Sequence, residues 1–157
     1  MKQIRQGVFE TNSSSTHSVT IYNAEDKYVY PKYLPAIEFG EYGWEQNLYP
    51  DYTDKLSYVI TMIGSKHELG GLSDESAKEE FLNCLHFLWL QDMVKEVCGV
   101  ELAVKFLDGW NPLGYIDHQS EDTLDAFWSD EEDEFKSKMK EFIFNEKYAF
   151  ETDNDNH

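Results

Sequence analysis

The sequence predicts an α+β fold, in which a small and mostly antiparallel sheet is packed by about three helices. Residues 17–23 alternate between apolar and polar side chains, as a half-buried strand does, and three longer segments carry apolar side chains at helical spacing. The aromatic fraction of 15% is too high for a disordered chain, although 28% of the residues are charged. A length of 157 residues suits one domain with a real core, so we expect a single domain covering residues 1–157.

The first half of the chain is expected to hold one strand, an irregular segment and one helix. In the strand at 17–23, Val19 and Ile21 share one face. Residues 24–52 are rich in proline and aromatic side chains, which allows only short strands at 27–30 and 37–39. A helix over 53–64 follows, with Thr53 as its cap and Gly64 as its end.

The longest predicted helix covers residues 74–98. Ser73 or Ser76 begins it, its middle is apolar on most sides, and Gly99 is a natural stop. Cys84 and Cys98 would then lie about 21 Å apart along one helix, which is too far for a disulfide bond between them. We expect both thiols to be reduced.

The second half of the chain is expected to complete the sheet and add a last helix. Residues 100–107 alternate like a strand and are predicted to join the strand at 17–23, with shorter strands at 115–116 and 148–150. Ser129 and Glu132 form a capping-box pattern at the start of a helix over 130–145. Its apolar stripe consists of Phe135, Met139, Phe142 and Ile143.

The chain carries a net charge of −18, and half of that charge comes from one segment. Residues 117–134 contain nine carboxylates and no lysine or arginine. This balance excludes a non-specific nucleic-acid binder, which needs clustered cations. The carboxylates have three possible roles: simple solubility, favourable placement at a helix start, or docking on a basic partner protein.

The sequence also bears on the compartment. It has no signal peptide at its start and no apolar stretch long enough to span a membrane. We therefore expect a cytoplasmic protein with no membrane partner.

The densest run of polar side chains lies at residues 5–18, directly before the predicted first strand. A guanidinium, a carboxylate, an imidazole, an amide and several hydroxyls in so short a segment suggest a site. Hydroxyls and backbone N–H groups bind phosphate well, and an arginine adds the charge that an anion needs. The expected ligand-binding residues are Arg5, Glu10, Asn12, Ser13, Ser14, Ser15 and Thr16.

Two further polar motifs follow expected strands, namely Asp117-His118 and Asp153-Asn154-Asp155. We expect His17, Asp117 and His118 to be catalytic, with the histidines available for acid–base work near neutral pH. The same groups could instead hold a metal ion, and a serine nucleophile activated by a histidine is a third possibility. The common phosphate-loop, hydrolase and zinc signatures are absent, so the sequence names no cofactor and leaves open whether the protein is an enzyme.

Residues 5–18, which read Arg-Gln-Gly-Val-Phe-Glu-Thr-Asn-Ser-Ser-Ser-Thr-His-Ser, resemble the start of a family of uncharacterised proteins from bacteriophages and Firmicutes. Residues 116–120, and residues 142–145 running on to 152–156, are similar to that family as well. The resemblance covers the two ends and one internal motif. It implies a phage or mobile-element setting and a shared polar site, and it implies no reaction.

Two functions follow as expectations. In the first, the three polar motifs form one pocket for a nucleotide-like or otherwise phosphorylated small molecule, with a hydrolytic or transferase reaction as a possibility. In the second, the chain is a non-enzymatic acidic inhibitor that imitates nucleic acid and docks on a basic host protein, such as a defence or nucleic-acid enzyme, in the host cytoplasm. A purely structural or virion-associated role is a third reading.

Overall fold

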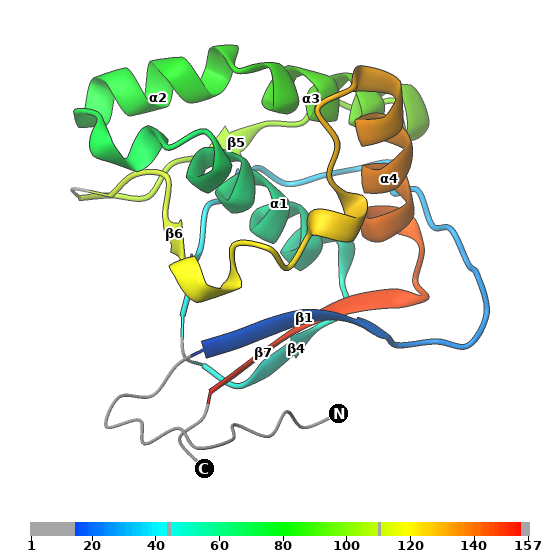
Figure 1. Ribbon diagram of the computed structural model, residues 1–157. Helices are drawn as coiled ribbons and strands as arrows, with labels where there is room; N and C mark the ends of the chain where they lie inside the picture. Colours follow the sequence, from blue (N-terminus) through cyan, green and yellow to red (C-terminus); the bar gives the residue numbers. More distant parts are fainter. Residues whose placement is uncertain (1–14, 44, 110, 155–157) are drawn as a thin grey trace.

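A computed structural model describes residues 15–43, 45–109 and 111–154, and it confirms the predicted α+β class. A three-stranded sheet forms one layer, and helix α1 (Tyr52–Lys66) lies across it (Figure 1). The other helices gather on the side of α1 away from the sheet (Figure 1). They are α2 (Asp74–Asn83), α3 (Leu85–Cys98) and α4 (Glu132–Phe144), and three short 3-10 turns complete the helical elements described: η1 (Leu69–Gly71), η2 (His118–Ser120) and η3 (Asp125–Phe127).

The three-stranded sheet is antiparallel and joins segments from far apart in the sequence. Strand β7 (Tyr148–Asn154) lies in the centre, between β1 (Ser15–Ile21) and β4 (Asn47–Tyr49). Phe150 is opposite Val19 on one side and Tyr49 on the other. The strand predicted at 148–150 is therefore longer than expected, and it lies in the centre of the sheet.

The prediction that residues 100–107 join this sheet is wrong. Only β5 (Val104–Lys105) forms there, and it pairs in parallel with β2 (Ile37–Glu38). A second parallel pair joins β3 (Glu41–Tyr42) to β6 (Tyr115–Ile116). The apolar side chains of 100–107 pack into the core instead: Leu102 is buried, and Phe106 stacks on Phe39 at 5.3 Å between ring centroids and lies edge-on to Phe81 of α2 at 6.4 Å.

The long helix predicted at 74–98 is two helices that meet at Cys84, whose backbone is extended (φ −76°, ψ 147°). The break has a packing reason. Phe81 and Phe87 are both buried, and their ring centroids lie 4.7 Å apart. In one continuous helix, six residues turn the side chain by about 240°, so these rings would face different sides. Both cysteines are free, in agreement with the sequence.

Two helix starts differ from the sequence prediction. Helix α1 begins after Asp51, and it continues past Gly64, where the missing Cβ faces the side chain of Leu113. At α4 the cap residue is Glu131, and Ser129 stabilises the turn before it. The Ser129 hydroxyl accepts from the Glu131 N–H at 3.0 Å and donates to the Glu134 carboxylate at 2.7 Å. Ser73 caps α2, as one of the two sequence alternatives proposed.

Aromatic side chains fill the space between α1 and the sheet. Tyr58 of α1 is fully buried and lies against Phe150 of β7, with 4.1 Å between ring centroids, and Tyr42 of β3 packs against both. In the described part of the chain, no helix combines the length and apolar character that crossing a bilayer requires.

Candidate functional site

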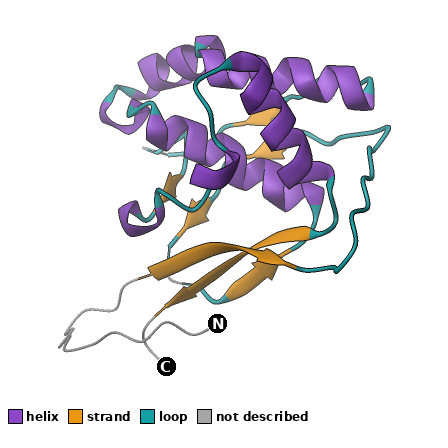
Figure 2. Cartoon of the chain, turned by 45° about the vertical axis from the view of Figure 1, so that its right-hand side comes forward, coloured by secondary structure: helices purple, strands orange, loops and turns teal. Residues whose placement is uncertain are grey.

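One end of the three-stranded sheet brings the described parts of the three polar motifs together (Figures 1 and 2). Strand β1 begins there with Ser15 and Thr16, and Thr16 lies opposite Asp153 at the end of β7. Turn η2, which begins at His118, packs against β1. The Thr123 hydroxyl lies at this contact, 2.7 Å from the Ser120 carbonyl of η2 and 3.2 Å from the His17 carbonyl of β1, and its one hydrogen is shared between these two acceptors. Segments separated by most of the sequence therefore share this sheet end, whereas the single pocket expected for the three motifs stays a prediction.

Part of the predicted site lies outside the described residues. This applies to the ligand-binding predictions for Arg5, Glu10, Asn12, Ser13 and Ser14, and to Asp155 of the third motif. Ser15 is placed by its backbone as the first residue of β1, opposite Asn154. All these functional assignments therefore stay predictions.

His17 is buried and anchors β1 to two neighbouring segments. Its Nε2 lies 2.9 Å from the Gly43 carbonyl, which can only accept, so Nε2 carries the proton. Its Nδ1, 2.9 Å from the Tyr58 hydroxyl, then accepts from that hydroxyl. Burial lowers the pKa of His17, and the hydrogen bond to Gly43 and the carboxylates of Glu45 and Asp117 oppose that shift. Because both ring nitrogens are engaged, a general base at His17 would first have to release one of these partners.

The surroundings of His17 are acidic and polar. Glu45 and Asp117 both act on its charge, and the Asp153 carboxylate accepts from the Gln46 amide at 2.9 Å. Ser120 is almost fully buried, and its hydroxyl has no hydrogen-bond partner among the described residues. This sheet end therefore offers carboxylates, which suit hydroxyl, amine or metal-bridged groups of a ligand.

The structure also contains a polar cluster that sequence reasoning missed. His67, just after α1, lies 2.7 Å from His86 of α3, measured between Nε2 and Nδ1. The His86 Nε2 lies 2.9 Å from the Ser129 carbonyl and 3.1 Å from the Asp130 carboxylate. The sequence held one signal for this cluster, because His86 is the imidazole inside the apolar run 81–90. Its partners come from segments far away in the sequence, and no local pattern names them.

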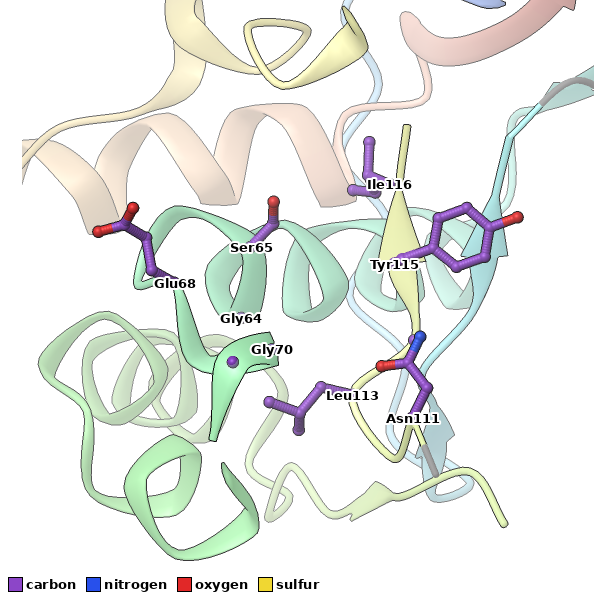
Figure 3. Close-up of a pocket in the computed structure, with 10 residues that line it drawn as sticks. Gly64, Ser65, Glu68, Gly70, Asn111, Leu113, Tyr115 and Ile116 are labelled. Atoms are coloured by element: carbon purple, nitrogen blue, oxygen red, sulfur yellow. The ribbon is translucent and has the colours of Figure 1, made fainter. Parts of the chain in front are cut away.

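A pocket of about 520 Å³ lies beside the end of α1 (Figure 3). Leu113 reaches across it toward Gly70, and Tyr115 points away from it (Figure 3). Glu68 at its edge has a left-handed backbone (φ 56°), which is costly for a residue with a Cβ. None of the sequence-predicted site residues is among the residues that line it, which are Gly64, Ser65, Glu68, Gly70, Gly71, Asn111, Leu113, Gly114, Tyr115 and Ile116.

Within residues 15–154, apart from positions 44 and 110, no group of three or more His, Cys, Asp or Glu side chains is arranged to hold a metal ion. Comparison with known proteins adds no assignment: no family model, no curated protein and no solved structure matches the chain.

Proposed function

We propose that this chain is a phage-type accessory protein whose polar sheet end binds a nucleotide-like or otherwise phosphorylated small molecule. The observation that supports the proposal is the convergence of β1, η2 and the end of β7, which carry the three polar motifs. Titratable and hydroxyl-bearing side chains from separate segments that meet at one place are the usual starting point for a binding-site hypothesis.

The charges of this sheet end define how such a ligand would bind. Asp117 and Glu45 repel a bare phosphate, so the anion needs a compensating cation. Arg5 is the cation that the N-terminal motif supplies, and a divalent ion bridging phosphate and carboxylate is the other source. The carboxylates are good acceptors for ribose hydroxyls. A nucleotide therefore fits this balance better than inorganic phosphate does.

Calorimetry with a panel of nucleotides, with and without Mg²⁺, tests this function. We expect saturable binding that Asp117→Asn weakens at least tenfold, about 1.4 kcal/mol, through loss of a charged acceptor. Asp108→Asn is the matched control, because Asp108 is exposed in another turn and carries the same charge. Equal affinity in the two variants, or no binding of any nucleotide to the unmodified chain, contradicts the proposal.

A second function is favoured by the acidic segment of residues 117–134, and we propose it as the alternative: non-enzymatic docking on a basic host protein. Five consecutive carboxylates, at residues 130–134, are exposed where α4 begins. Lys136 and Lys138 neutralise two of them, Glu132 and Glu134. Among described residues, Glu131 and Asp133 have no ion-pair partner, so they remain available to a basic surface.

A pull-down from host extract, followed by affinity measurement at rising salt, tests the docking alternative. Neutralising residues 130–133 together should weaken binding and flatten its salt dependence, because exposed charge pairs are screened by ions. The control is a variant with four neutralised carboxylates of α2, at positions 74, 75, 79 and 80. The alternative fails if both variants bind the captured protein equally well.

A further inference from the structure

The histidine pair beside the acidic segment ties three separate elements together. His67 lies at the end of α1, His86 in the first turn of α3, and Ser129 and Asp130 immediately before α4. His86 is 6% exposed and is enclosed by aromatic rings: Trp128 stacks on it at 4.5 Å between centroids, and Trp89 and Phe135 each lie at 4.9 Å. His67 is half-buried, and the pair therefore links the helical layer to the segment that leads into α4.

The hydrogen-bond partners fix where the protons of this pair lie. The Ser129 carbonyl and the Asp130 carboxylate both accept, so His86 carries a proton on Nε2. A neutral His86 then has a lone pair on Nδ1, which accepts from the Nε2–H of His67 at 2.7 Å. One additional proton on Nδ1 of His67 leaves this bond intact. A second additional proton must go to Nδ1 of His86, where it removes the only acceptor and places two imidazolium rings in contact.

We propose that the His67–His86 pair is an acid-sensitive latch, which holds residues 127–131 against α1 and α3 while the pair carries at most one extra proton and releases that segment when it takes a second. Release separates Trp128 from His86 and frees the start of α4, where the exposed carboxylates begin. The inference does not depend on either proposed ligand, because it rests on the pair and its partners alone.

The charged groups around the pair set the direction of this effect. Asp130 favours protonation, whereas burial lowers the pKa of His67 and the charge of His86 lowers it further. On the His67 side, Lys66 at the end of α1 lies 5.1 Å from the centroid of the Trp128 ring and pairs with Asp125 of η3 at 3.1 Å. The charge of Lys66 is therefore largely compensated. From the α4 side, the Glu134 carboxylate is bound by the Ser129 hydroxyl. The remaining contacts, from Trp89 and Phe135, are uncharged.

Amide hydrogen exchange, corrected for intrinsic rates, measures this release residue by residue. The reporters are the hydrogen-bonded amides of Phe127, Trp128 and Phe135, and the amide of Val59 in the middle of α1 reports on global unfolding. Each exchange rate gives an opening constant, which is the ratio of open to closed populations at that amide. We expect the opening constants of the three reporters to rise on acidification below about pH 6.5, by up to tenfold per pH unit for each proton taken up. The opening constant of Val59 should change much less.

Two variants separate the latch from a general effect of acid. His67→Gln keeps a donor toward His86 but cannot take up a proton, so its reporters should lose their extra pH dependence. His17→Gln removes the other buried histidine and should retain it. If His67→Gln opens with acid as the unmodified chain does, or if Val59 exchanges in parallel with the reporters, the latch is refuted.

Asp130→Asn supplies a test that does not disturb packing, because the Asp130 side chain is 86% exposed. Removing this carboxylate makes the doubly protonated pair less favourable, while the amide oxygen keeps an acceptor near His86. The closed state loses the carboxylate that favours its protonated form, whereas the open state loses no such contact. The segment should therefore open at a higher pH than in the unmodified chain. An unchanged midpoint would show that the pair does not control the segment.

Discussion

Lys55 is a fully buried lysine, and its replacement by methionine gives the sharpest test of how the layers are joined. The side chain is 1% exposed. Its ammonium group donates to the carbonyls of Asn145 at 3.3 Å and Tyr148 at 2.9 Å, and lies 5.7 Å from the centroid of the Phe142 ring. One side chain of α1 thus satisfies carbonyls at the end of α4 and the start of β7.

The expected loss follows from these contacts. Methionine retains an apolar stem of similar length, so the main change is two carbonyls that lose a charged donor, each worth about 1.5–3 kcal/mol. Removal of the ammonium group also removes the cost of burying its charge, which offsets part of that loss. We expect Lys55→Met to lower the free energy of unfolding by about 2 kcal/mol at neutral pH.

The pH dependence of stability tests the role of Lys55 independently. Burial lowers the pKa of Lys55 to about 8, from 10.5 in an unfolded chain. Above pH 8 the unfolded chain therefore binds a proton that the folded chain has lost, and stability rises with pH by up to about 1.4 kcal/mol per pH unit. Lys55→Met should abolish this rise. The window closes near pH 10, because burial raises the pKa of Tyr58 and tyrosine ionisation then favours the unfolded chain.

Urea unfolding between about pH 7.5 and 9.5 measures both effects. Lys27→Met is the matched control: the Lys27 side chain is 71% exposed and pairs with the exposed Glu146, so a change below about 0.5 kcal/mol is expected. The reasoning is refuted if Lys55→Met and Lys27→Met have the same stability, or if the rise with pH persists in Lys55→Met.

Three further predictions concern other parts of the fold. Gly114→Ala should cost at least about 3 kcal/mol in thermal or urea unfolding, because a Cβ at φ +62° would clash with the Gly40 carbonyl oxygen. Gly99→Ala, at φ +73° with open space around it, should cost only about 1 kcal/mol. Tyr58→Phe should lower stability by about 1–3 kcal/mol, since the His17 Nδ1 loses its donor, and a double-mutant cycle with His17→Phe should show coupling. Burial lowers the pKa of His17 and His67, so the unfolded chain binds more protons just below pH 6.5 and urea midpoints should fall on acidification; constant midpoints would contradict this.

The sequence was informative wherever one segment determines its own structure. The alternation around Val19 correctly indicated a strand, and the apolar stripe of Phe135 and Met139 correctly indicated a helix. Ile21, which was expected on the same buried face as Val19, is instead 61% exposed at the end of β1. Both signals are local, because a strand or helix must bury one face at its own period. The fold class follows from a few such signals and needs no knowledge of the contacts between them.

Strand partners and helix breaks depended on contacts that no local pattern records. Residues 100–107 alternate as strands do, yet Leu102 is buried in the core and Phe106 packs against Phe39 and against Phe81 of α2. The break at Cys84 is set by the need to bury Phe81 and Phe87 together. The same limit applies to the candidate site. Polar motifs marked the segments that meet at the sheet end, whereas His67 became visible only through its contact with His86.

The pairing of β1 with β7 has a consequence for how the chain is made. During synthesis β1 leaves the ribosome among the first described elements, and its partner strand leaves last. Until then the hydrogen-bonding edge of β1 and the apolar side chain of Val19 have no sheet to join. The sheet can form only after the two ends of the described chain have come together, and such non-local pairing is expected to be slow. Until then, only the helices can give the nascent chain structure. A truncation before residue 148 should therefore leave a collapsed helical chain that aggregates through an unpaired β1.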